Sequence, residues 1–183
     1  MKNKKTKAIL LASACAVFVP LLAACSQTQE TPDPVPESNV SSAASSAPGG
    51  QALSLDSMAQ EIISGLSLEG LEQSEPDMAM ERIYGLTEEE QAQVEEVAVY
   101  VGTGGASADE VSVWRAKDAD GVTMIQEKIQ GRIDTQKANF TNYQPQEMPK
   151  LENPCIVTQG NTVVLVIAGN SDEAASLIEG MLG

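Results

Sequence analysis

The pattern of apolar and polar positions divides the chain into three parts: an apolar run near the N-terminus, a polar stretch, and a long region with helical and strand periodicities. The polar stretch, residues 25–50, is rich in Ser, Pro and Gly and has almost no large apolar side chain. Such a segment buries too little surface to offset its ordering entropy. The pattern therefore predicts a disordered tether over 25–50 and a single α+β domain over 51–183.

Helical periodicity recurs in several places within that domain. Apolar residues repeat every three to four positions over 55–64, over 118–140 and from Asn170 or Ser171 toward the C-terminus, which predicts three amphipathic helices. The middle helix is the longest, and its apolar stripe consists of Val122, Ile125, Ile129, Ile133 and Phe140. Shorter helices are expected over 77–84 and from a capping box that begins at Thr87.

Alternating apolar and polar residues predict two pairs of strands. The first pair covers 97–101 and 111–114, and the second covers 155–158 and 162–168, with short turns between partners. The last strand is apolar on both faces, so we expect it to be central and to lie beside the first. Segment 68–75 fits a short strand or a loop. The expected order is an N-terminal helix followed by ββαββα, which makes a four-stranded antiparallel sheet packed by helices.

The apolar run at the N-terminus is typical of a bacterial lipoprotein signal. Lys2, Lys4, Lys5 and Lys7 precede an uncharged stretch of roughly 15 residues, whereas a spanning helix needs about 20. The run ends in Leu22-Ala23-Ala24-Cys25. We expect residues 1–24 to be removed as a signal peptide and Cys25 to carry diacylglycerol. The alternative is an ordinary secretory signal that happens to be followed by a cysteine.

Charge and composition narrow the function classes. The chain has 11 basic and 26 acidic residues, and removal of four signal lysines leaves seven basic residues and a net charge near −19. That excess of acids argues against a nucleic-acid partner. Histidine is absent, which excludes Ser-His and Cys-His catalytic pairs and His-ligated zinc. Cys155 opens an apolar strand, and we expect its thiol to be buried and unreactive.

One segment imitates a calcium-binding loop. Asp118, Asp120 and Glu127 fall at spacings that such loops use for their ligands. The first ligand position is Ala116, however, and a strand rather than a helix precedes the segment. Helix capping by Asp118 or Asp120 accounts for the same residues, so we expect no metal site and no cofactor.

Four polar residues form the best candidate site. Arg132 and Gln136 are one helical turn apart, on a face that adjoins the apolar stripe of the long helix. Tyr143 follows the expected end of that helix and could close over them. Glu110 opens the preceding strand, and it is the first expected partner of Arg132. This cluster is interpreted either as a structural tie or as a site for a small anionic or peptide ligand, because guanidinium groups serve both purposes.

Short matches along the chain also carry a family resemblance. They are Ile83-Tyr84-Gly85-Leu86, Val99-Tyr100, Ala108-Asp109-Glu110-Val111, Arg132-Ile133 with Gln136, Phe140-Thr141-Asn142-Tyr143-Gln144-Pro145, and Gly160 before an apolar strand. In these residues, from about Leu55 to Ala168, the chain resembles the small lipoproteins of Gram-positive bacteria grouped as domain-of-unknown-function family 4358. The resemblance implies the same architecture and an envelope location, and it brings no assigned activity.

The sequence thus predicts a lipid-anchored protein on the extracytoplasmic face of the cell membrane. We expect a non-enzymatic binding or interaction module at the cell envelope, whose partner is an envelope protein or a small ligand. A structural component of envelope assembly is the first alternative, and it would present a broad apolar patch. A hydrolase that uses carboxylates or a Ser/Lys pair is the second, and it would present a pocket with a carboxylate of raised pKa.

Overall fold

The computed structural model describes residues 53–183, so the expectations for the signal segment 1–24, for Cys25 and for the tether 25–50 lie outside the described residues. Its centre is one antiparallel sheet with the strand order β1-β2-β3-β5-β4. The five strands are β1 (Leu71–Ser74), β2 (Val94–Gly102), β3 (Glu110–Ala116), β4 (Cys155–Gln159) and β5 (Thr162–Ile167).

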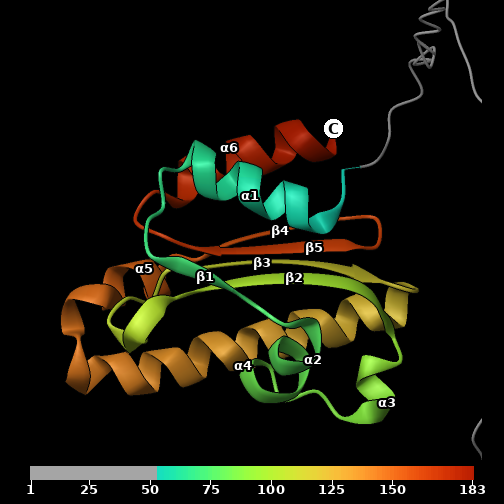
Figure 1. Ribbon diagram of the computed structural model, residues 1–183, viewed down its shortest axis with the longest axis horizontal. Helices are drawn as coiled ribbons and strands as arrows, with labels where there is room; N and C mark the ends of the chain where they lie inside the picture. The colour runs from blue at the N-terminus through green and yellow to red at the C-terminus, as the bar shows by residue number, and fades with distance from the viewer. Residues whose placement is uncertain (1–52) are drawn as a thin grey trace, which may run out of the picture. The chain divides into compact units, whose positions relative to one another are not determined.

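Helices cover both faces of this sheet. The helices are α1 (Leu55–Gly65), α2 (Pro76–Met78), α3 (Glu88–Gln91), α4 (Ala119–Tyr143), α5 (Met148–Glu152) and α6 (Ser171–Leu182), with a π-helical turn at Ala79–Ile83 and 3-10 turns at Thr103–Gly105 and Pro145–Glu147. Figure 1 shows α1 and α6 side by side on one face and α4 along the other. The domain is therefore a three-layer α+β structure.

Side-chain caps begin α1, α3 and α4 where the sequence predicts them. The Ser54 side chain caps α1, and Thr87 and Glu90 form the expected capping box at α3. The Asp118 carboxylate accepts a hydrogen bond from the Gly121 N–H at 2.9 Å and caps α4. Asp118 thus satisfies one of the N–H groups that the first turn of a helix leaves without a partner, as the capping interpretation requires.

Strand alternation distributes the apolar residues between two cores. On β3, Val111 and Val113 face α1 and α6, whereas Trp114 faces α4. On β5, Val164 and Val166 join the first core, and Val163, Leu165 and Ile167 join the second. Both faces of β5 are buried and it has a strand on each side, which confirms its predicted central position.

The sheet differs from the prediction in strand number and in order. It has five strands rather than four, because part of segment 68–75 forms β1 and pairs with Val99–Gly102 of β2. It also places β5 beside β3, so the predicted contact between the first and last strands is wrong. The cause is that β1 occupies the free edge of β2, and β3, which is buried over nearly its whole length, takes β5 as its second neighbour.

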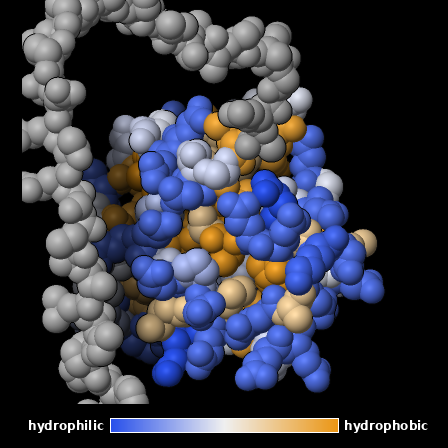
Figure 2. All heavy atoms as spheres, turned by 45° about the vertical axis from the view of Figure 1, so that its right-hand side comes forward, coloured by the Kyte–Doolittle hydropathy of each residue, from blue (hydrophilic) through white to orange (hydrophobic). Residues whose placement is uncertain are grey.

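The long helix also extends further than the periodicity predicts. It continues past Phe140 to Tyr143, and the chain then forms a 3-10 turn and α5 instead of a loop. Among residues 53–183, no helix is long and apolar enough to cross a membrane. In Figure 2, hydrophilic side chains make up most of the face in view, and apolar atoms appear in the recesses between them.

Candidate functional site

A fully buried carboxylate lies at the centre of the candidate site. Glu110 begins β3, and its register places it between Val101 of β2 and Ile167 of β5. Strand alternation points it toward α4, on the same face as Ser112 and Trp114. Its side chain is 0% exposed. A carboxylate in such a place is costly unless charged or polar groups compensate it.

Four hydrogen bonds compensate the Glu110 carboxylate. Arg132 donates to Oε2 through Nε at 3.0 Å and through Nη2 at 2.8 Å. The Gln136 amide donates to the same oxygen at 2.6 Å, and the Tyr84 hydroxyl donates to Oε1 at 2.5 Å. Because Arg132 and Gln136 are one turn apart on α4, the helix delivers both donors to one oxygen. The structure therefore contains the Arg132–Glu110 ion pair that the sequence predicts.

Tyr84 continues the network into the core. Its hydroxyl also lies 2.8 Å from Ser112 Oγ. A phenol has one proton and an ionised carboxylate only accepts, so Tyr84 donates to Glu110 and accepts from Ser112. Ser112 in turn accepts from the Trp114 indole N–H at 3.1 Å. Burial, reinforced by the negative charge of Glu110, raises the pKa of Tyr84 well above its usual value, so the phenol stays neutral.

The Gln136 amide has one atom without a partner. Its Nε2 must face Glu110, because a carboxylate cannot donate a hydrogen bond to Oε1. This orientation leaves Oε1 buried and without a hydrogen-bond donor among the described residues, although Gln136 is only 4% exposed. A buried acceptor left unpaired costs about 1–3 kcal/mol. Such an atom is informative in a native structure, because most buried polar groups are paired.

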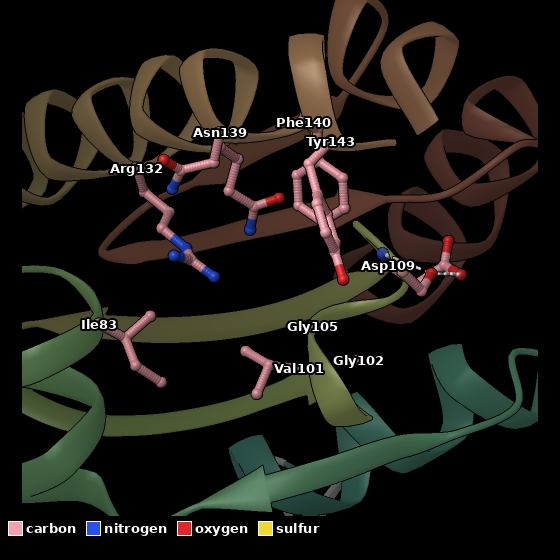
Figure 3. A pocket seen from close by; sticks show the side chains of 11 residues that line it. Ile83, Val101, Gly102, Gly105, Asp109, Arg132, Asn139, Phe140 and Tyr143 are labelled. Carbon is pink, nitrogen blue, oxygen red and sulfur yellow. Dashed lines mark hydrogen bonds between the residues drawn. The ribbon is translucent and has the colours of Figure 1, made fainter. Parts of the chain in front are cut away.

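A cavity of about 400 Å³ lies directly beside this network. Arg132 and Gln136 contribute to its wall from α4, together with Phe140 and Tyr143 further along the helix. Figure 3 shows Ile83 and Val101 on the opposite side, and Gly102 at the end of β2 and Gly105 in the turn that follows at one end. The cavity therefore combines an apolar enclosure with a polar wall.

A second ionic cluster holds the loop at the end of the cavity. Lys150 lies 2.9 Å from both Asp109 and Glu147, and Glu147 also accepts from the Ala108 N–H at 2.9 Å. Burial alone would raise the pKa of Glu147, but the Ala108 N–H and the Lys150 ammonium outweigh it and hold that pKa below its usual value. Burial likewise opposes the charge of Lys150, but Glu147 and Asp109 raise its pKa, so it remains an ammonium.

The structure brings together three of the four predicted site residues. Glu110, Arg132 and Gln136 are hydrogen-bonded, whereas Tyr143 belongs to the last turn of α4, is 76% exposed, and its hydroxyl makes no hydrogen bond to a described residue. Tyr143 lines the cavity instead. The hydroxyl that closes the network comes from Tyr84, which is not among the four predicted site residues. Alternation on β3 puts Ser112 on the Glu110 face, and it was the available signal for a polar row there.

Two other residues singled out by sequence lie away from the cavity. Cys155 belongs to the core under α1 and α6, is 6% exposed, and has a pKa raised by burial and then by the charges of Glu179 and Asp172. It is buried, as the sequence predicts. Asp118 is engaged as a helix cap. No cluster of three or more metal-ligating residues occurs within the described range 53–183.

The protein is thus a small three-layer α+β domain. It has a cavity of about 400 Å³ next to a buried carboxylate that accepts four hydrogen bonds. The chain belongs to the family described as Domain of unknown function (DUF4358), whose model matches residues 65–168. The matched range runs from the end of α1 through β5 and includes Glu110, Arg132 and Gln136. Comparisons with curated proteins and with solved structures found no match.

Proposed function

We propose that this protein is a lipid-anchored, extracytoplasmic binding module whose ligand occupies the cavity beside the Glu110–Arg132 pair. The observation that carries the proposal is Gln136 Oε1, a buried acceptor that has no donor among residues 53–183 and belongs to a residue of the cavity wall. A ligand that donates a hydrogen bond to it would remove the cost of leaving it unpaired. A volume of about 400 Å³ lies within the range of small-molecule sites, which is about 300–1,000 Å³.

The state of the ionisable groups supports a non-enzymatic role. The Glu110 carboxylate accepts four hydrogen bonds and is inaccessible, so it is not available as a general base. Ser107 lines the cavity and has Lys150 nearby through Asp109. The raised pKa of Lys150 keeps it protonated, which opposes a Ser/Lys mechanism. Both observations favour binding over hydrolysis.

The N-terminal sequence supports the location. A basic cluster, a short apolar run and the ending Leu22-Ala23-Ala24-Cys25 are the features of a lipoprotein signal. In this proposal two acyl chains on Cys25 hold the protein at the membrane, since stable anchoring needs two hydrophobic signals. The acidic chain avoids nucleic acid and keeps the domain away from anionic headgroups. The partner is a small ligand or a group displayed by an envelope component.

A fragment screen tests whether the cavity binds. The full-length chain in detergent would be screened by ligand-observed NMR with neutral and charged fragments of about 10–15 non-hydrogen atoms. Asn139 is exposed and lines the cavity, so Asn139→Trp should obstruct it from the surface of α4. Ala138→Trp is the matched control, because Ala138 is exposed on the same helix and does not line the cavity.

The proposal requires fragments that bind the wild type and Ala138→Trp and lose binding in Asn139→Trp. Equal binding to all three proteins would place the fragments elsewhere. No binding at all would contradict a ligand role for the cavity. In both cases the proposed function would be rejected.

A further inference from the structure

We infer that the cavity recognises a neutral amide whose carbonyl oxygen and N–H lie on the same side, as in a primary carboxamide or a lactam, attached to an apolar group. This inference rests on the proposed function and specifies the chemistry of its ligand. It depends on the hydrogen-bonding groups that Arg132 and Gln136 have left after they bind Glu110.

Arg132 and Gln136 each have a hydrogen-bonding atom that Glu110 does not use. Arg132 uses Nε and Nη2 for Glu110, and its Nη1 makes no hydrogen bond to any described residue. Gln136 uses Nε2 for Glu110 and retains Oε1. Both residues line the cavity. Two residues that line the cavity therefore keep one unused donor and one unused acceptor, on side chains that meet at a single carboxylate oxygen. Because Oε1 is buried, the proposed ligand reaches it through a small movement of the Gln136 side chain.

The charges of Arg132 and Glu110 favour a neutral ligand. The Arg132 guanidinium lies 2.8 Å from a carboxylate that is fully buried, so its charge is already balanced. An anionic ligand would meet the charge of Glu110 behind that guanidinium, in a chain of net charge −15. A cationic ligand would meet the guanidinium itself. A neutral group that accepts from Nη1 and donates to Oε1 avoids both repulsions.

The apolar part of the cavity lining suits an apolar group on the ligand. Ile83, Val101 and Phe140 give the cavity apolar surfaces, and the exposed ring of Tyr143 stands at its rim. In Figure 3 the Tyr143 and Phe140 rings lie at one end of the cavity and Arg132 lies at the other. An amide with a short apolar group matches this division, with the amide at the Arg132 end and the apolar group toward the rings.

A series of four probes of similar shape tests the inference. They are 3-phenylpropanamide, its N,N-dimethyl amide, 3-phenylpropanoate and 3-phenylpropylamine. The primary amide has a donor and an acceptor, the dimethyl amide lacks the donor, the carboxylate is anionic, and the amine is cationic. Dissociation constants would be measured on the full-length chain by NMR titration. The same titration of Asn139→Trp, whose cavity is obstructed, measures the signal change that comes from partition of the probe into detergent.

The primary amide should bind most tightly, and each of the other three should bind at least about tenfold more weakly, as expected when a buried hydrogen-bonding group is left unpaired. Gln136→Met keeps the length of the side chain and removes Oε1. In that variant the primary and dimethyl amides should bind within about twofold of each other. The ratio of the two amides' dissociation constants can still be interpreted if Gln136→Met is less stable than the wild type, provided that circular dichroism shows the variant to be folded.

Tighter binding of 3-phenylpropanoate would show an anion site and overturn the amide inference, while the proposed binding function would stand. An equal affinity of the two amides for the wild type would overturn it as well. Absence of binding by all four probes, in a protein whose cavity binds other fragments, would also reject the amide class. Absence of every fragment from the cavity would reject the proposed function itself.

Discussion

Glu110 is a carboxylate at a position where its neighbours across the sheet are Val101 and Ile167. An apolar residue there would pack well, but it would leave the donors of Arg132, Gln136 and Tyr84 without their acceptor. Glu110 therefore positions three side chains from two distant segments. The cost of burying its charge is offset by four hydrogen bonds, two of which come from a cation.

Arg132→Met should destabilise the domain by about 3 kcal/mol, because it removes the cation from a carboxylate that stays buried. Glu110→Gln should add little to that loss, since the charge that needs Arg132 would be absent. The free energy of unfolding from urea denaturation measures both effects. Arg115→Met is the matched control: its partner Glu96 is 40% exposed, so the loss should be about 1 kcal/mol or less. Equal stability of Arg132→Met and wild type would refute the structural role.

Tyr84 should give the protein a measurable sensitivity to alkali. Its raised pKa means that the folded state keeps a proton that an unfolded tyrosine loses above about pH 10. Its contribution to stability is thus fully present below about pH 10 and is lost as the pH rises toward the folded pKa. Where the folded state binds one proton more than the unfolded state, each pH unit in that window lowers the free energy of unfolding by about 1.4 kcal/mol.

Tyr84→Phe should reduce the slope of unfolding free energy against pH between about pH 10 and 11.5. The slope should not vanish, because Tyr100 and Lys150 also have raised pKa values and act in the same direction. Urea denaturation at several pH values, followed by circular dichroism, gives the slopes. Parallel slopes for the two proteins would mean that Tyr84 ionises in the folded state as readily as in the unfolded chain.

Part of this site could be predicted from local spacing. Arg132 and Gln136 are one turn apart beside an apolar stripe, and Glu110 starts the preceding strand, so their meeting follows from a strand–helix pair that packs face to face. Tyr84 could not be predicted in the same way. It is 26 residues from Glu110 and ends a π-helical turn, and only tertiary packing brings its hydroxyl to the carboxylate.

Among the elements, those with strong periodicity or side-chain caps could be predicted. The α1, α4 and α6 helices have amphipathic stripes, and β5 is continuously apolar. By contrast, β1 is only four residues long and half exposed, so its strand conformation depends on pairing with β2 rather than on its own pattern. Strand order depends on which faces pack together, and single strands do not encode it.

The turn and helix after α4 position the loop at the end of the cavity through Glu147. Glu147→Ala removes the acceptor of the Ala108 N–H and one partner of Lys150. We expect hydrogen exchange at the Ala108 amide to quicken by at least about tenfold, with a loss of about 1–2 kcal/mol in stability. Glu152→Ala is the control, because Glu152 is exposed on α5. Unchanged protection at Ala108 would mean that Glu147 does not hold this loop.

The whole molecule combines the proposed lipid anchor at Cys25 with the α+β domain that contains the cavity. Cys25→Ser should abolish incorporation of an alkyne fatty acid and leave the signal segment attached, because the Cys25 thiol is the proposed acceptor of the lipid. Gel mobility and click labelling of envelope fractions report both outcomes. Normal labelling of the variant would show that the anchor is elsewhere.

Native mass spectrometry of the full-length protein, extracted gently from the cell envelope that produced it, shows directly whether the cavity holds a ligand. We expect a bound small molecule on the wild type and on Ala138→Trp, and its loss from Asn139→Trp, whose added ring obstructs the cavity. A wild-type protein that carries no small molecule would contradict a small-molecule ligand. A small molecule that Asn139→Trp retains equally would contradict the claim that this cavity is the binding site.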